Sequence, residues 1–386
     1  MSNKKQQAAR RNRRRLAKMM MKKMKMTRKD EIKSIRMLKL LFRPMTKYLS
    51  PALKRFLSKQ LGVRMVTSDD TQFLLYKLVD YNLQNVSNGS LQRNGKSVCA
   101  VDKIIRHAIR GRNVVCHSVL PEVKAKSESF ITSWIKVARL IGAKDVAVKL
   151  QETRQFLSNN TGKFPRVPSP AKRQRSMVSI FRALESDKKS NWSKTKEMAA
   201  SAIEDVLFDT IAEDFAMPMR DFMTINLNLL PYNSTVDSYV QLKFALAKCS
   251  PANFVAPEDG SVFDLSHLQT VMNSRHAVIH VQHRNTLPNW EKYFKSLIYV
   301  SLGIGATRSA RMISRIYESL LAARKEARRQ IKRARLLPPI LRNRQNIFVK
   351  GETAKMNSRW LGRKNSGRKH LTKGPSSNNN QPGASA

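Results

Sequence analysis

Arginine and lysine side chains crowd both ends of this chain, and they are the residues whose chemistry is easiest to state. The segment QAARRNRRRLAKMMMKKMKMTRK, residues 7–29, contains no acidic residue. Flexible cations of this kind neutralise phosphates and displace counterions without requiring a particular base sequence. We expect phosphate contacts from Arg10, Arg11, Arg13, Arg14, Arg15, Lys18, Lys22, Lys23 and Lys25.

A second set of cations follows a predicted helix over residues 309–337, in which apolar residues such as Ile313, Ile316 and Leu320 recur at three- and four-residue steps. An aromatic residue among cations further along can stack on an unpaired base, which favours a single-stranded nucleic acid. The candidates here are Arg324, Lys325, Arg328, Arg329, Lys332, Arg333, Arg335, Trp360, Arg363 and Lys364.

The distribution of charge along the 386 residues separates these ends from the middle. The chain has 73 Lys and Arg against 27 Asp and Glu, a formal net charge of +46. Residues 1–64 contribute +20, residues 308–386 contribute +17, and the stretch between them only +9. Like charges at this density repel one another unless a polyanion is present. The ends therefore indicate polyanion-binding arms on an ordinary core.

Three other interpretations of the N-terminal run stay open. An Arg-rich, acid-poor start also suits a mitochondrial transit peptide, although serine is scarce and a second basic arm exists. A membrane-surface helix would need an apolar face, which the alternating methionines and lysines do not form. A solvated run that contacts nothing is the third.

Other residue types offer little chemistry. His276, His280 and His283 have a spacing that could bind zinc on a helix, but no Cys, Asp or Glu lies within the segment. Moreover, the surrounding AVIHV predicts a strand, which would send His280 and His283 to opposite faces. We expect no metal and no cofactor. Cys99, Cys116 and Cys249 are too few and too scattered for a disulfide framework.

No catalytic constellation is evident, and we expect no enzyme. Cys116 and His117 are adjacent residues, which rarely face each other. Gly303 and Gly305 precede a basic helix but lack the rest of a nucleotide-binding fingerprint, so we interpret them as a hinge. The longest apolar run, residues 296–306, is about half of the roughly 20 residues that span a bilayer, so we expect no membrane insertion.

Helical periodicity dominates the chain, and we predict a mainly α fold, with α+β as the alternative. Two helix-rich lobes are expected, with a small sheet in the second from the alternating segments 222–230, 238–246 and 276–283, and short strands at 97–101 and 113–119 in the first. The acidic helix 197–214 has either a solvated face or a surface that docks a neighbouring subunit's arm. The predicted parts are a basic arm and amphipathic helix (1–64), the first lobe (65–160), a Pro-rich linker (161–175), the second lobe (176–307), the basic helix (308–337) and a flexible tail (338–386).

A basic end, a near-neutral core and a basic, polar far end resemble the organisation of viral coat and nucleocapsid proteins with charged arms. The resemblance lies in the charge layout and in no sequence motif. It implies a structural protein that packages genomic RNA, assembles with copies of itself, and occurs in the virion and host cytoplasm, with the nucleus as a further location. Single-stranded RNA is favoured over DNA.

Two alternatives belong to other classes. A structural protein of an organellar ribosome or another ribonucleoprotein would explain the basic ends, and it predicts a mitochondrial location with a trimmed N-terminus. A nucleic-acid enzyme or replication initiator would need clustered acids or a nucleophile, and no spacing in the sequence supplies them.

Overall fold

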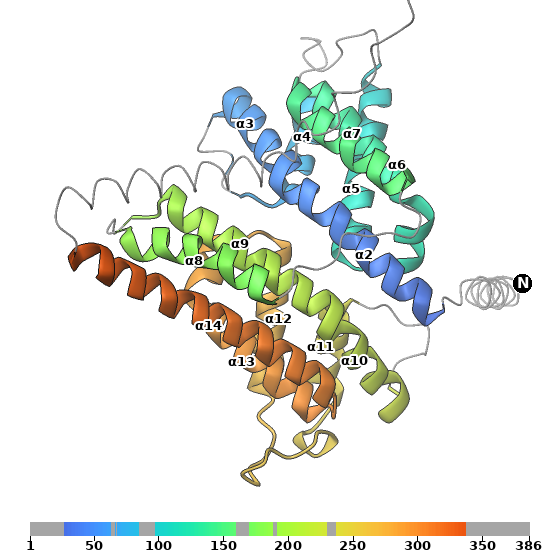
Figure 1. Cartoon of the computed structure of the whole chain (residues 1–386). Helices are drawn as coiled ribbons and strands as arrows, with labels where there is room; N and C mark the ends of the chain where they lie inside the picture. The colour runs from blue at the N-terminus through green and yellow to red at the C-terminus, as the bar shows by residue number, and fades with distance from the viewer. Residues whose placement is uncertain are drawn as a thin grey trace, which may run out of the picture. The chain divides into compact units, whose positions relative to one another are not determined.

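The computed structural model describes residues 27–62, 66, 68–84, 97–159, 170–187, 191–229 and 237–336. This part of the chain is mainly helical and contains no strand (Figure 1). One compact unit reaches Lys325 and a second begins at Glu326, and each is described by itself. The predicted division into two lobes stays a prediction.

The chain enters the structure through three helical segments without a break: α2 (Arg28–Pro44), the π-helical turn η1 (Met45–Leu49) and α3 (Ser50–Leu61). Thr27 caps α2, because its hydroxyl accepts a hydrogen bond from the Asp30 amide at 3.2 Å. Helix α2 ends at Pro44. The chain nevertheless stays helical through the π-helical turn η1, where the Thr46 hydroxyl also donates to the Phe42 carbonyl.

Four helices follow: α4 (Thr71–Gln84), α5 (Val98–Cys116), α6 (Leu120–Leu140) and α7 (Lys144–Asn159). The strands predicted at 97–101 and 113–119 are wrong, because both segments belong to α5 or the turn after it. Ser97 caps α5, and its buried residues recur at helical steps. Gly111 allows a close approach of α6, since a Cβ there would lie 2.8 Å from the Phe130 Cβ.

The rest of the described chain forms α8 to α14 with short π and 3-10 turns. The predicted linker is helical at its end, because α8 begins at Pro170, while residues 160–169 lie outside the described residues. The elements are α8 (Pro170–Ser186), α9 (Lys194–Thr210), η3 (Ile211–Phe215), α10 (Ala216–Asp221), η4 (Phe222–Asn226), α11 (Ser238–Lys248), η5 (Pro251–Asn253), α12 (Ser266–Ile279), α13 (His283–Gly303) and α14 (Thr307–Leu336).

The small sheet predicted in the second lobe is wrong for the described residues. Residues 222–226 form η4, 238–246 lie in α11, and 276–279 end α12. In α11 the Asp237 carboxylate caps the first turn by accepting from the Tyr239 amide at 3.0 Å, and Leu242 and Ala245 are buried three residues apart. Local capping and helical burial therefore prevail over the alternating pattern, and the mainly α prediction is confirmed.

Helix α2 joins the helices that follow it to the acidic segment of α9 and η3. It packs against α5, α6 and α7 and also contacts η3. The Lys39 ammonium lies 2.7 Å from a Glu213 oxygen and 3.2 Å from Asp209, and the Arg43 guanidinium lies 2.8 Å from Asp209. Lys47 pairs with Asp205. The acids of the predicted 197–214 helix thus contact cations of their own chain.

Candidate nucleic-acid interface

The first part of α14 is held on the compact unit by its apolar side. Ile313, Leu320 and Ala323 are buried. The Tyr317 ring stacks on Phe294 of α13 at 5.9 Å between centroids, consistent with the neighbouring courses of α13 and α14 in Figure 1. The predicted apolar stripe is therefore present, and the helix occupies nearly the predicted range.

Arg324 differs from the other cations predicted to contact phosphate. Its Nε lies 2.8 Å from Glu185 of α8, and its Nη1 lies 2.7 Å from Glu291 of α13. The side chain is 31% exposed. Two carboxylates already neutralise this guanidinium, so the residue ties α14 to two neighbouring helices.

The remaining α14 candidates are exposed. Lys325 ends the compact unit, and the second unit has one acid, Glu326, against five cations before Leu336. Arg329 lies 3.8 Å from Glu326, an exposed pair of small energetic value. Steps of three and four residues place these side chains along the helix surface, where they can follow a phosphate backbone. The five cations are Arg328, Arg329, Lys332, Arg333 and Arg335.

The other predicted contacts lie outside the described residues and stay predictions. They are Arg10, Arg11, Arg13, Arg14, Arg15, Lys18, Lys22, Lys23 and Lys25 at the N-terminus and Trp360, Arg363 and Lys364 near the C-terminus.

Two buried arginines of the compact unit serve its internal structure. Asp70 accepts a hydrogen bond from the Arg112 guanidinium at 2.8 Å and lies 2.9 Å from the His280 Nδ1. Asp237 lies 2.9 Å from Arg275 and 2.8 Å from His117. Asp70 thus links Arg112 of α5 to His280, which follows α12. Asp237 links His117, which follows α5, to Arg275 of α12. Both arginines are therefore paired with acids inside the folded chain.

The three histidines whose spacing on a helix could bind zinc do not share a strand. His276 lies in α12, His280 follows its end, and His283 begins α13. His280 faces Asp70, whereas the His283 Nδ1 lies 2.9 Å from Glu204. Among the residues that the structure describes, no group of three or more His, Cys, Asp or Glu side chains is placed to hold a metal ion.

The His283 and Glu204 pair is expected to make stability fall as pH rises. Burial lowers the pKa of His283, but the contact with Glu204 raises it above its ordinary value, while burial raises the pKa of Glu204. The folded pair therefore keeps a proton to a higher pH than a free histidine. Its stabilisation is complete below about pH 6.5 and is lost as pH rises through the raised pKa.

His283→Gln should flatten this loss, measured as the melting temperature from about pH 6.5 upward. His276→Gln is the control, because burial and the neighbouring His280 lower the pKa of His276, so its contribution changes below about pH 6.5 and H276Q should keep the wild-type dependence above it. A wild-type melting temperature that rises over this range, or one that falls equally in H283Q, would contradict the prediction.

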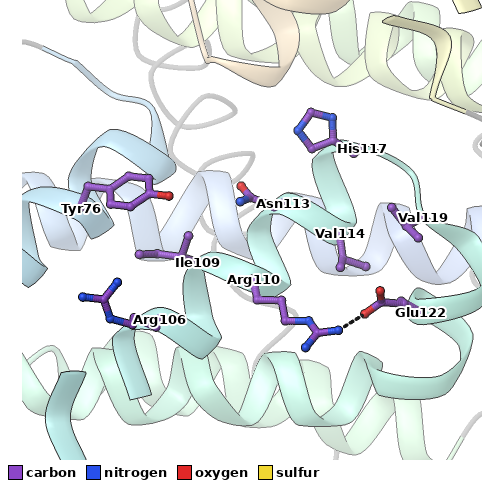
Figure 2. A pocket seen from close by; sticks show the side chains of 9 residues that line it. All are labelled: Tyr76, Arg106, Ile109, Arg110, Asn113, Val114, His117, Val119 and Glu122. Atoms are coloured by element: carbon purple, nitrogen blue, oxygen red, sulfur yellow. Dashed lines mark hydrogen bonds and ion pairs between the residues drawn. The ribbon is translucent and has the colours of Figure 1, made fainter. Parts of the chain in front are cut away.

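A cavity of about 590 Å³ lies between α4, α5 and α6. Figure 2 shows Tyr76 from α4 facing a row of side chains from α5, with Glu122 of α6 paired to Arg110. Steps of four, three and four residues align the polar members of that row along α5. The lining residues are Tyr76, Arg106, Ile109, Arg110, Asn113, Val114, His117, Val119 and Glu122.

The sequence analysis did not single out this cavity. Arg106 and Arg110 lie in the middle of the chain, where acidic and basic residues are mixed and no charge run marks them. The available signal was the spacing of Arg106, Arg110, Asn113 and His117 on one helical face. These residues share a face only if α5 is helical as far as Cys116, whereas the sequence pattern predicts a strand at 113–119.

No family model, curated protein or solved structure matches this chain. The helices in the described part of the chain include none with the length and apolar composition needed to cross a lipid bilayer.

Proposed function

We propose that this chain is a structural RNA-binding protein of the nucleocapsid kind, which packages single-stranded RNA by sequence-independent phosphate neutralisation and self-assembles. The observation that supports it best is the difference in exposure among its cations. Arg112, Arg275 and Lys39 are buried against carboxylates, whereas the end of α14 presents five exposed cations with one acid. These five belong to the basic C-terminal end, and the two basic ends together hold most of the net charge.

The proposal predicts comparable affinity for unrelated RNA sequences and a steep loss of affinity with salt. Each phosphate contact to a single strand contributes about 0.7 to the slope of log K against log salt concentration. Replacing three α14 cations, in R329Q/K332Q/R333Q, should therefore reduce the magnitude of the slope by about 2. Fluorescence anisotropy with two labelled RNA oligonucleotides of unrelated sequence measures it.

A matched variant removes three exposed cations elsewhere, in K136Q/R139Q/K144Q on α6 and α7. It has the same net charge as the α14 variant, and glutamine is a good helix former in both. We expect the control to change the slope by less than the α14 variant. Equal slopes in the two variants would show that total charge, and no particular surface, sets the affinity.

Assembly is tested separately by mixing the protein with RNA and measuring sedimentation. The proposal expects ordered particles of fixed protein-to-RNA ratio that contain the intact N-terminus. Isolation from the source with a trimmed N-terminus and bound ribosomes would favour the organellar alternative.

A further inference from the structure

We propose that the cavity between α4, α5 and α6 seats one nucleotide of the bound single-stranded RNA, with its base on Tyr76 and its phosphates on Arg106 and Arg110. This inference rests on the proposed function and adds a defined site within the core to the contacts made by the basic ends.

Tyr76 supplies the stacking surface. The residue is 46% exposed. Among the exposed large hydrophobic residues in the described part of the chain, Tyr76 is the one aromatic residue. Its ring borders the cavity opposite α5 (Figure 2). Stacking of a base on an aromatic side chain contributes about 1–3 kcal/mol and accepts every base, because each has a π face. A sequence-independent protein can therefore use this ring.

Each of the two arginines is oriented by one carboxylate, which contacts only part of its guanidinium. Arg106 lies 2.7 Å from Asp102 through Nε, which leaves its terminal nitrogens to face other groups, and its side chain is 60% exposed. Arg110 lies 3.0 Å from Glu122 through Nη2 and is 57% exposed. Exposed ion pairs contribute at most about 1 kcal/mol, whereas a guanidinium binds phosphate through two parallel hydrogen bonds.

Glu122 has a second cationic partner besides Arg110. Its carboxylate also lies 3.3 Å from the Lys126 ammonium, so it keeps a partner when Arg110 turns. Burial opposes ionisation of Glu122, but the hydrogen bonds from Arg110 and Lys126 lower its pKa below the ordinary value. The Glu122 carboxylate therefore stays ionised at neutral pH and orients the side chains of Arg110 and Lys126.

The rest of the lining suits a base and a ribose. Ile109, Val114 and Val119 offer an apolar floor, and Asn113 offers an amide with donors and an acceptor. A volume of about 590 Å³ falls in the usual range of small-ligand sites. Because Tyr76 and both arginines are exposed, the strand can enter and leave the site along the surface.

The test compares a probe with bases and a probe without them, using the full chain. Tyr76→Leu should weaken binding of a fluorescein-labelled oligouridylate by about 5- to 150-fold, the factor that corresponds to a lost stack. Binding of labelled inorganic polyphosphate should not change. Tyr76→Phe keeps the ring and should bind both probes like the wild type. R106Q/R110Q should weaken both probes and lower the salt slope by about 1.4.

Failure of this inference can be distinguished from failure of the proposed function. If the wild type binds neither probe, the proposed function is wrong. If the wild type binds oligouridylate and Tyr76→Leu binds it equally well, the proposed function stands and the nucleotide site is wrong.

A measurement on the unaltered protein does not depend on whether the variants fold. Photo-crosslinking to a thiouridine-containing oligonucleotide should label a peptide from α4 or α5. Labels found only in residues 1–26 and 337–386 would overturn the site.

Discussion

Asp70→Ala is expected to lower the free energy of unfolding by about 3–5 kcal/mol. The reason is that Arg112 is 1% exposed, and removal of Asp70 leaves its charge buried with the loss of its carboxylate partner. His280 loses its contact with the same carboxylate. The variant should show this loss as a lower urea midpoint.

The neighbouring Asp69 provides the control. It pairs with Lys54 at 2.6 Å, but the two side chains are 43% and 37% exposed, so Asp69→Ala should cost at most about 1 kcal/mol. Equal losses in the two variants would show that burial of the Asp70 pair is not what stabilises this region.

The Asp70 effect should also depend on pH. Burial raises the pKa of this carboxyl, but the contacts with His280 and Arg112 lower it more, so it lies below the ordinary value. The stabilisation is therefore fully present above about pH 4 and is lost as pH falls through the lowered pKa. The difference in stability between wild type and Asp70→Ala should shrink in acid.

Deletion of residues 1–26 is expected to have the largest effect on RNA binding. The deletion removes eleven cations and no acid. If all of them contact phosphates, the salt slope should fall by up to about 8, with a loss of affinity on the order of a hundredfold or more at physiological salt. Anisotropy with one labelled RNA over a range of salt concentrations measures both quantities.

The deletion stops at residue 26 because the next two residues contact the folded part of the chain. Thr27 caps α2, and Arg28 lies 3.3 Å from Asp221, so both residues are kept. The melting temperature of the shortened chain should then match that of the full chain. A salt slope that does not change would show that the N-terminal cations make no phosphate contacts.

Helices with a continuous apolar stripe could be predicted from the sequence. The apolar stripe predicted a helix over residues 308–337, and α14 spans Thr307–Leu336. The segments of the predicted sheet failed because alternation over eight or nine residues is also compatible with a helix. Caps such as Asp237 decide between the two, and their hydrogen bonds appear only in the folded backbone.

The candidate interface could be predicted only in part, because sequence lists cations without their partners. Arg324 belongs to the same run as Lys325, yet its two acids lie 139 and 33 residues earlier in the chain. Arg112 is likewise paired with an acid 42 residues away. Exposure depends on such distant pairings, and therefore the separation of structural cations from available ones needed the three-dimensional arrangement.

The pairing of α2 with α9 and η3 has a consequence for synthesis of the chain. Lys39 and Arg43 meet acids that lie 174 and 166 residues later. At about 5–20 residues per second, these cations are synthesised roughly 10 to 30 s before Asp209 and Glu213. During that interval the nascent chain presents Lys39 and Arg43 without the acids that pair with them in the finished protein. We expect polyanions to compete with the later acids for these two cations.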